Sequence, residues 1–253
     1  MLYISARNNK LTYTGYQALT MHAAEDGGVI VPIRFPYFDR KDLRTVLNLS
    51  FGACAAEILG KFFSLSQNRS QIISCFNSAV PTYCALDRRT LLVNYHDSYV
   101  HSSDNIEDEI YALMANGHPD MPTMPRCAIR IALIFGLFSQ LKKFGLTQVD
   151  IAVSSAELCD YLPAIFCKEM GLPIKRIICG SSNDEGLWNY MRKEIASNIV
   201  FSAVVSDSRA NDIIHGLKST IKQDLSLESA FAYGALQDYR AITGENDSTI
   251  ILN

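Results

Sequence analysis

Through most of the first 80 residues, apolar side chains recur at three- and four-residue spacing, the period of an amphipathic helix. Thr14 and Gln17 stand at the spacing of a capping box and predict a helix over residues 14–24. We expect this helix to end at Gly27 and Gly28, because glycine readily adopts the left-handed geometry of a helix end. The same spacing predicts helices over residues 41–49, 54–63 and 68–77. The N-terminal part should be mostly helical.

From Cys127 onward, helical periods alternate with short apolar runs of the kind found in buried strands. Such alternation favours a parallel sheet with right-handed helical crossovers. Predicted helices span residues 127–144, 158–170, 184–195, 208–218 and 227–242, and predicted strands span residues 148–153, 174–179, 199–205 and 248–252. The expected fold class is α/β: a helical N-terminal part followed by an open, mostly parallel sheet.

Between these two parts the pattern is weaker. Residues 29–32 and 91–94 read as short extended segments, whereas residues 96–125 are polar, acidic and interrupted by three prolines. We interpret the latter as a loop. The expected organisation is an N-terminal part over residues 1–95, a loop over residues 96–126 and an α/β part over residues 127–253.

Composition limits the classes of partner. The net charge of -3 provides no basic surface for nucleic acid or anionic lipid. The seven cysteines include no C-x-x-C pair, and the longest apolar stretch, residues 129–138, is interrupted by Arg130 and too short to span a bilayer. The first residues lack the apolar core of a signal peptide. We therefore expect a cytoplasmic protein with reduced thiols that binds neither nucleic acid nor membrane.

Three stretches, in the same order, resemble the threonine synthase family, pyridoxal phosphate (PLP) enzymes of fold type II that convert O-phosphohomoserine into threonine. Residues 3–7 (YISAR) with 24–32 (AEDGGVIVP) are similar to the opening motifs of the family. Residues 168–187 (KEMGLPIKRIICGSSNDEGL) follow another family motif almost position by position. Residues 228–239 and 248–253 resemble its C-terminal helix and the strand after it. The resemblance implies a truncated PLP fold type II large domain.

The lysine that a PLP enzyme needs is missing from the position that the resemblance gives it. Only a primary amine exchanges as a Schiff base with the cofactor. Residues 95–104 (YHDSYVHSSD) align without a gap to the family's lysine motif and retain His96 and Asp104, but place Ser103 at the lysine. A hydroxyl group cannot form an imine. We expect Ser103 to leave the chain without this chemistry.

Two more parts of the family's site are altered. The glycine-rich phosphate loop aligns with residues 153–160, where Ala156, Glu157 and Cys159 replace two glycines and an asparagine. Glycine allows close backbone approach to a phosphate, and a carboxylate repels it. The segment that carries most of the family's small mobile domain is reduced to residues near 106–125, with Arg130 as the possible counterpart of a family arginine. We expect no bound PLP.

Other candidate sites have simpler explanations. His96, Asp97, His101 and Asp104 could hold a divalent metal, but their spacing matches no known ligand pattern, so we expect none there. The serines at 102, 103, 154 and 155 lack a nucleophile elbow. Trp188 and Tyr190 with Asp184 and Glu185 could line a pocket, although an amphipathic helix with an acidic start explains them equally well. We interpret His118 as a loop residue.

The leading hypothesis is a threonine synthase-like pseudoenzyme with a binding or regulatory role and no catalytic residues. One alternative is residual PLP-dependent lyase activity on O-phosphohomoserine through a lysine outside the aligned motif. Another is a small-molecule sensor that binds an amino acid or a phosphate compound at the carboxyl ends of the strands. Expected partners are a second copy of the chain or a synthase of the family.

Overall fold

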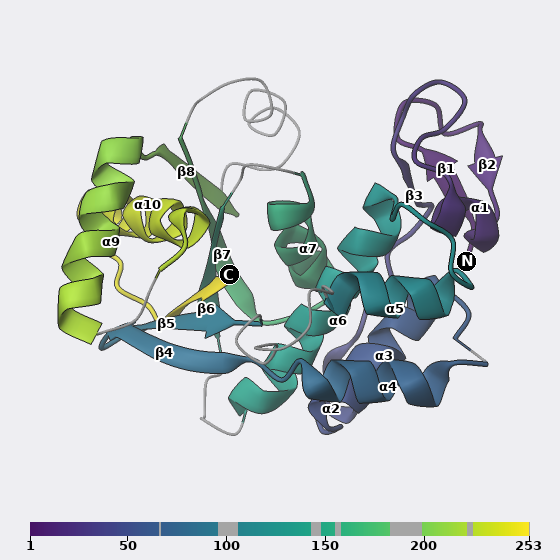
Figure 1. Cartoon of the computed structure of the whole chain (residues 1–253), viewed down its shortest axis with the longest axis horizontal. Helices are drawn as coiled ribbons and strands as arrows, with labels where there is room; N and C mark the ends of the chain where they lie inside the picture. Colours follow the sequence, from purple (N-terminus) through teal and green to yellow (C-terminus); the bar gives the residue numbers. More distant parts are fainter. Residues whose placement is uncertain are drawn as a thin grey trace. The chain divides into compact units, whose positions relative to one another are not determined.

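The structure is a computed structural model of the 253-residue chain, and it describes residues 1–65, 67–95, 106–142, 148–154, 158–182, 199–221 and 225–252 (Figure 1). The chain forms two compact units. Unit 1 comprises residues 1–80, 98–146 and 166–172, and unit 2 comprises residues 81–97, 147–165 and 173–253. These units do not coincide with the boundaries expected at residues 95 and 127, because residues 98–146 are grouped with the N-terminal part.

A small antiparallel sheet in unit 1 brings together the two opening motifs of the resemblance. Its strands are β1 (Tyr3–Ser5), β2 (Thr12–Tyr13) and β3 (Ile30–Pro32), in the order β2-β1-β3. The Ser5 hydroxyl donates to Asp26 Oδ1 at 2.7 Å, and the Gly28 backbone N–H donates to the same oxygen at 2.9 Å. A Cβ at Gly28 would lie 2.2 Å from Ser5 Oγ. The motif residues Ser5, Asp26 and Gly28 therefore form a structural clamp.

The helices of unit 1 follow the predicted pattern in most places. Helix α1 (Gly15–Thr20) has the capping box between Thr14 and Gln17 that the sequence predicts, but it ends at Thr20, earlier than residue 24. Gly27 is left-handed, with φ of 73°, in a turn after the helix and not at its end. The other predicted helices are confirmed as α2 (Arg40–Val46), α3 (Phe51–Phe62) and α4 (Arg69–Ser78).

Residues 106–126 contain a helix where the sequence analysis expected a loop. Helix α5 (Ile106–Met114) buries Ile106, Ile110 and Tyr111. Buried positions at four-residue spacing form one helix face, so the apolar period was present but was obscured by the acidic residues of the first turn. The loop prediction is wrong for this segment. The part over residues 96–105 lies outside the described residues.

Helix α6 (Thr123–Leu141) is the central helix of unit 1. It packs against α3, where Gly136 leaves room for the Phe51 ring and the Cys54 thiol donates to the Phe135 carbonyl at 3.4 Å. By length and composition alone α6 could cross a membrane, but 83% of its apolar window is buried inside the protein. Its apolar composition is that of a core helix.

Unit 2 contains a six-stranded sheet in the order β4-β5-β9-β6-β7-β8. Five strands run parallel to one another and confirm the predicted strands: β5 (Thr90–Asn94), β6 (Val149–Ser154), β7 (Ile174–Ser181), β8 (Val200–Val204) and β9 (Thr249–Leu252). The edge strand β4 (Thr82–Asp87), which was not predicted, pairs antiparallel with β5. The α/β class with a mostly parallel sheet is confirmed.

Three described helices accompany this sheet: α7 (Leu158–Glu169), α9 (Asp207–Ile221) and α10 (Leu227–Thr243), all three of which were predicted. Helix α10 contacts β6, β7, β8 and β9, with α9 beside it (Figure 1). At the end of α7, Gly171 has a φ of 108°, a left-handed conformation that suits glycine. The predicted helix over residues 184–195 lies outside the described residues.

Candidate functional site

The carboxyl ends of the parallel strands form the edge at which open α/β sheets usually bind ligands. Strand β6 ends at Ser154 and β7 ends at Ser181, and both side chains are buried. Ser154 lies beside Gly180 in the parallel register of these strands. The described part of this edge therefore carries small hydroxyl side chains on the neighbouring inner strands β6 and β7.

Most residues of the predicted site lie outside the described residues. This applies to His96, Asp97, His101, Ser103, Asp104, Ala156, Glu157, Asp184, Glu185, Trp188 and Tyr190. Their assigned roles stay predictions. Within the part of the chain that the structure describes, no three histidine, cysteine or acidic residues are grouped so that they could hold a metal ion.

Of the residues to which the resemblance assigns a place in the PLP site, the structure describes Cys159 and Arg130. Cys159 replaces a glycine of the phosphate loop in the resemblance, and here it lies in the first turn of α7 with 6% of its surface exposed. A buried thiol at this position packs as part of an ordinary structural helix. The Cys159 side chain therefore contributes to packing.

Arg130, on helix α6, is held by Glu107 of helix α5. The Arg130 Nε–H donates to Glu107 Oε1 at 2.6 Å, and an Nη2 donor lies 3.4 Å from Glu107 Oε2. The Glu107 side chain is only 9% exposed and that of Arg130 is 31% exposed. A guanidinium group in a two-point contact with a carboxylate is already neutralised. The possible counterpart of the family arginine thus joins two helices of unit 1.

Replacing Glu107 by Gln should lower the free energy of unfolding by about 1–3 kcal/mol, because the neutral amide leaves the partly buried guanidinium group without its counter-charge. Urea denaturation followed by circular dichroism measures the change. Glu109→Gln is the matched control, since it removes the same charge from the same first turn of α5. An equal loss in both variants would show that the effect comes from the acidic first turn and not from the pair.

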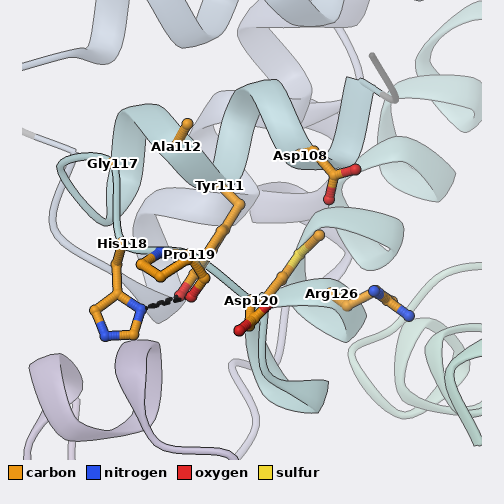
Figure 2. Close-up of a pocket in the computed structure, with 9 residues that line it drawn as sticks. Asp108, Tyr111, Ala112, Gly117, His118, Pro119, Asp120 and Arg126 are labelled. Atoms are coloured by element: carbon orange, nitrogen blue, oxygen red, sulfur yellow. Dashed lines mark hydrogen bonds between the residues drawn. The ribbon is translucent and has the colours of Figure 1, made fainter. Parts of the chain in front are cut away.

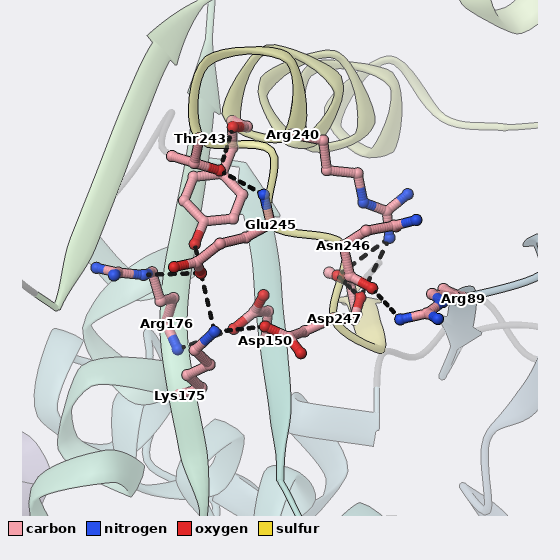
Figure 3. A network of polar contacts seen from close by, with 11 residues as sticks. Arg89, Asp150, Lys175, Arg176, Arg240, Thr243, Glu245, Asn246 and Asp247 are labelled. Atoms are coloured by element: carbon pink, nitrogen blue, oxygen red, sulfur yellow. Dashed lines mark hydrogen bonds and ion pairs between the residues drawn. The ribbon is translucent and has the colours of Figure 1, made fainter.

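A second polar cluster, which we call the amino-edge network, lies at the opposite end of the sheet of unit 2. Lys175, at the start of β7, contacts Glu245 Oε2 at 2.9 Å and also binds Asp247 (Figure 3). The hydrogen bonds that the Lys175 ammonium group donates to Asp247 and Glu245 hold the pKa of Lys175 above its usual range. Arg176 Nε lies 3.6 Å from the same Glu245 oxygen. This network links the amino ends of the strands to the segment that follows α10.

Asp150 is the buried member of the amino-edge network. It is the second residue of β6 and has no exposed surface. Its Oδ1 accepts the Arg176 backbone N–H at 3.1 Å, whereas Oδ2 has no hydrogen-bond partner. Burial, followed by the negative charge of Asp247, raises the pKa of Asp150 to about 6. Asp150 is therefore held in its charged form at a cost in stability near neutral pH.

Sequence reasoning did not find the amino-edge network. Its members come from β6, β7 and the segment after α10, and Lys175 and Asp247 are 72 positions apart. Only the acidic run beside Gly244 gave a local signal, and it did not identify a partner. The long sequence separation explains why no local pattern reveals these contacts.

The comparisons with known proteins agree with this architecture. The sequence profile of the family "Threonine synthase N terminus" matches residues 2–80. No curated protein matches the chain.

Three threonine synthase structures share the fold. The enzyme from Escherichia coli matches with a TM-score of 0.72 and 13% identity, covering 100% of this chain and 87% of that chain. The PLP-bound enzyme from Brucella melitensis matches with a TM-score of 0.74 and 11% identity, covering 100% and 88%. The yeast enzyme matches with a TM-score of 0.69 and 13% identity, covering 99% and 86%. The chain thus resembles threonine synthases in two ways: residues 2–80 match the N-terminal model of that family, and the whole chain has a similar fold.

Proposed function

We propose that this chain is a non-catalytic member of the threonine synthase family that acts by binding and does not use PLP. The proposal depends on where its amines lie. A PLP enzyme needs a lysine Nζ at the reacting face of the cofactor. In the α/β unit the structure describes two lysines, Lys175 and Lys218.

The position of Lys175 is the observation that carries the proposal. It lies at the amino end of β7, the edge opposite to the one where such sheets bind ligands. Its ammonium group is fixed by Glu245 and Asp247, which favour the charged form. A charged amine has no lone pair with which to attack an aldehyde. Lys175 is therefore in the wrong place and the wrong protonation state.

Lys218 is also remote from the carboxyl edge. Helix α9 begins just after β8 ends, and Lys218 lies eleven residues beyond its first residue, Asp207, in the last turn. That distance is about 16 Å along a helix. Ser103 at the aligned lysine position and the pairing of Arg130 with Glu107 also support the proposal that the chain does not use PLP.

We expect the purified chain to take up no stoichiometric PLP. Incubation with PLP followed by borohydride reduction and peptide mass spectrometry should show only low, scattered modification of exposed lysines. A Ser103→Lys variant should behave in the same way, because the predicted phosphate loop lacks its glycines. A threonine synthase treated in parallel provides the positive control.

A borohydride-reduced PLP adduct on a single lysine of the wild-type chain, at one adduct per protein molecule, would contradict the proposal. If phosphate were also released from O-phosphohomoserine, residual lyase activity would be the better description. Full occupancy only in the Ser103→Lys variant would instead show that the phosphate site is intact and that the lysine alone was lost.

The proposed setting is the cytoplasm, and the proposed partner is a second copy of the chain or a threonine synthase. None of the seven cysteines, all of which the structure describes, forms a disulfide bond, which suits a reducing compartment. Burial raises the pKa of the Cys54 thiol to about 12 and that of Cys167 well above its usual range, so these thiols react slowly. Sedimentation at micromolar concentration, alone and with a synthase, tests the partners.

A further inference from the structure

A pocket of about 480 Å³ lies on unit 1 beside helix α5 and the start of α6. Its volume is within the range of sites for small metabolites. Asp108, Tyr111, His118, Asp120, Met121 and Arg126 contribute to its lining. Because every lining residue belongs to unit 1, the pocket does not depend on the PLP site.

The loop that forms one wall has a defined backbone. Asn116, Gly117 and Asp120 all have left-handed φ angles, of 50°, 77° and 58°. Asparagine and aspartate tolerate this conformation because their short side chains bond locally. The loop is anchored to α5, since the Gly117 N–H donates to the Ala112 carbonyl at 3.0 Å. This wall is therefore shaped by the fold.

His118, Tyr111 and Met121 contribute polar and apolar atoms to the pocket lining. His118 Nδ1 lies 2.7 Å from the Pro119 carbonyl, so this nitrogen carries the hydrogen. The buried Tyr111 donates its hydroxyl to the Leu19 carbonyl at 3.2 Å, and Met121 also lines the pocket. Met121, with the small exposed part of Tyr111, offers an apolar surface for a short aliphatic chain.

Charges of both signs lie on the walls. Figure 2 shows Asp108 and Arg126 on one side of the pocket and His118 on the other, with Asp120 between them. Among the described residues, no ion pair or side-chain hydrogen bond involves the carboxylates of Asp108 and Asp120. These two carboxylates are available to a cationic ligand.

The Arg126 end keeps a positive charge. Arg126 Nε lies 3.9 Å from Glu107 Oε2, and its Nε–H makes no hydrogen bond. Glu107 is shared with Arg130, so one carboxylate faces two guanidinium groups. Arg126 therefore shares Glu107 with Arg130 and lines the pocket together with Asp108.

We propose that this pocket binds a basic amino acid. Arg126 recognises its carboxylate, Asp108 its α-ammonium group and Asp120 its side-chain ammonium group, while the aliphatic stem lies against Tyr111 and Met121. Two carboxylates and one guanidinium group match two ammonium groups and one carboxylate. A simple amine or a neutral amino acid satisfies only part of this set.

The test compares three probes of similar length by ligand-observed NMR titration of the full chain. L-lysine carries all three charged groups, cadaverine lacks the carboxylate, and L-norleucine lacks the distal ammonium group. L-lysine should bind about three- to fivefold more tightly than either of the others, the effect of one partly exposed ion pair. Binding of cadaverine equal to that of L-lysine would overturn the amino-acid assignment.

Asp120→Asn is the informative variant, because asparagine keeps both the size and the left-handed conformation of the residue. It should lower the affinity for L-lysine about three- to fivefold and leave the affinity for L-norleucine unchanged. Glu169→Gln, an exposed charge change in unit 1 outside the pocket, is the control. The site assignment fails if L-lysine does not bind, or if Asp120→Asn and the control bind it equally.

Discussion

Replacing Gly180 by Ala should lower the free energy of unfolding by about 3 kcal/mol or more, the upper range for an overpacked core. Gly180 lies on β7 directly beneath helix α10. A Cβ there would lie 2.0 Å from the Phe231 carbonyl oxygen and 2.4 Å from its carbon. Both are backbone atoms of a buried helix, so no side-chain rotation relieves the contact. Urea denaturation of the wild type and the variant measures this decrease in the free energy of unfolding.

Two other glycines provide graded controls for this prediction. Gly216→Ala in α9 meets nothing within 4 Å and should stabilise the chain by up to about 1 kcal/mol, the helix propensity of alanine. Gly234→Ala in α10 meets Val205 methyl carbons at 2.8 and 2.9 Å and should fall between the two. A Gly180→Ala protein as stable as Gly216→Ala would refute the close packing of α10 on β7.

Replacing Asp150 by Asn should raise the free energy of unfolding at pH 7.5 by about 2 kcal/mol. The pKa of Asp150 is raised from 3.8 to about 6, which corresponds to at most about 3 kcal/mol between the charged and neutral forms. Asparagine retains an oxygen for the Arg176 N–H and removes the buried charge. Its amide group can also donate toward the neighbouring carboxylates.

The sign of this effect depends on pH. Because the folded state binds the Asp150 proton more tightly than the unfolded chain, the wild type loses stability as pH rises from about 4 to about 6. The variant has no such loss, so the two proteins should have similar stability near pH 4, diverge between pH 4 and pH 6, and keep a constant difference at higher pH. Urea titrations at several pH values measure the separation.

Asp87→Asn is the control of opposite sign. Burial tends to raise the pKa of Asp87, but hydrogen bonds from Thr90 and Arg89 and the charge of Arg240 outweigh it and lower the pKa. Its charged form therefore stabilises the fold, and Asp87→Asn should reduce stability at pH 7.5. Stabilisation by both variants would indicate a general effect of removing negative charge, with no special role for Asp150.

The local pattern of apolar and polar residues was sufficient to predict most of the helices and strands. The Thr14–Gln17 capping box, the ends of α7 and α10 near Gly171 and Gly244, and the strands from β5 onward all appear close to where the spacing predicted them. These features depend on residues a few positions apart. Local geometry and burial on one face decide them.

The local sequence pattern did not predict helix α5 or strand β4. The first turn of α5 contains three acidic residues, which suggested a solvated loop, yet Glu107 is buried because Arg130 comes from another helix to neutralise it. Strand β4 is mostly exposed and lacks a clear apolar alternation, so its pairing with β5 is what defines it. In both cases a distant partner determines the local structure.

The sequence by itself determined the periodic elements, the α/β class and the motifs that connect this chain to threonine synthases. Tertiary structure alone decided that the last strand, β9, inserts between β5 and β6, that Arg130 pairs with Glu107, and that Asp150 loses its water. The reason is physical: spacing along the chain encodes which side of an element is apolar. The choice of partner and the free energy of a buried charge depend on contacts such as Asp87 with Arg240, 153 positions apart.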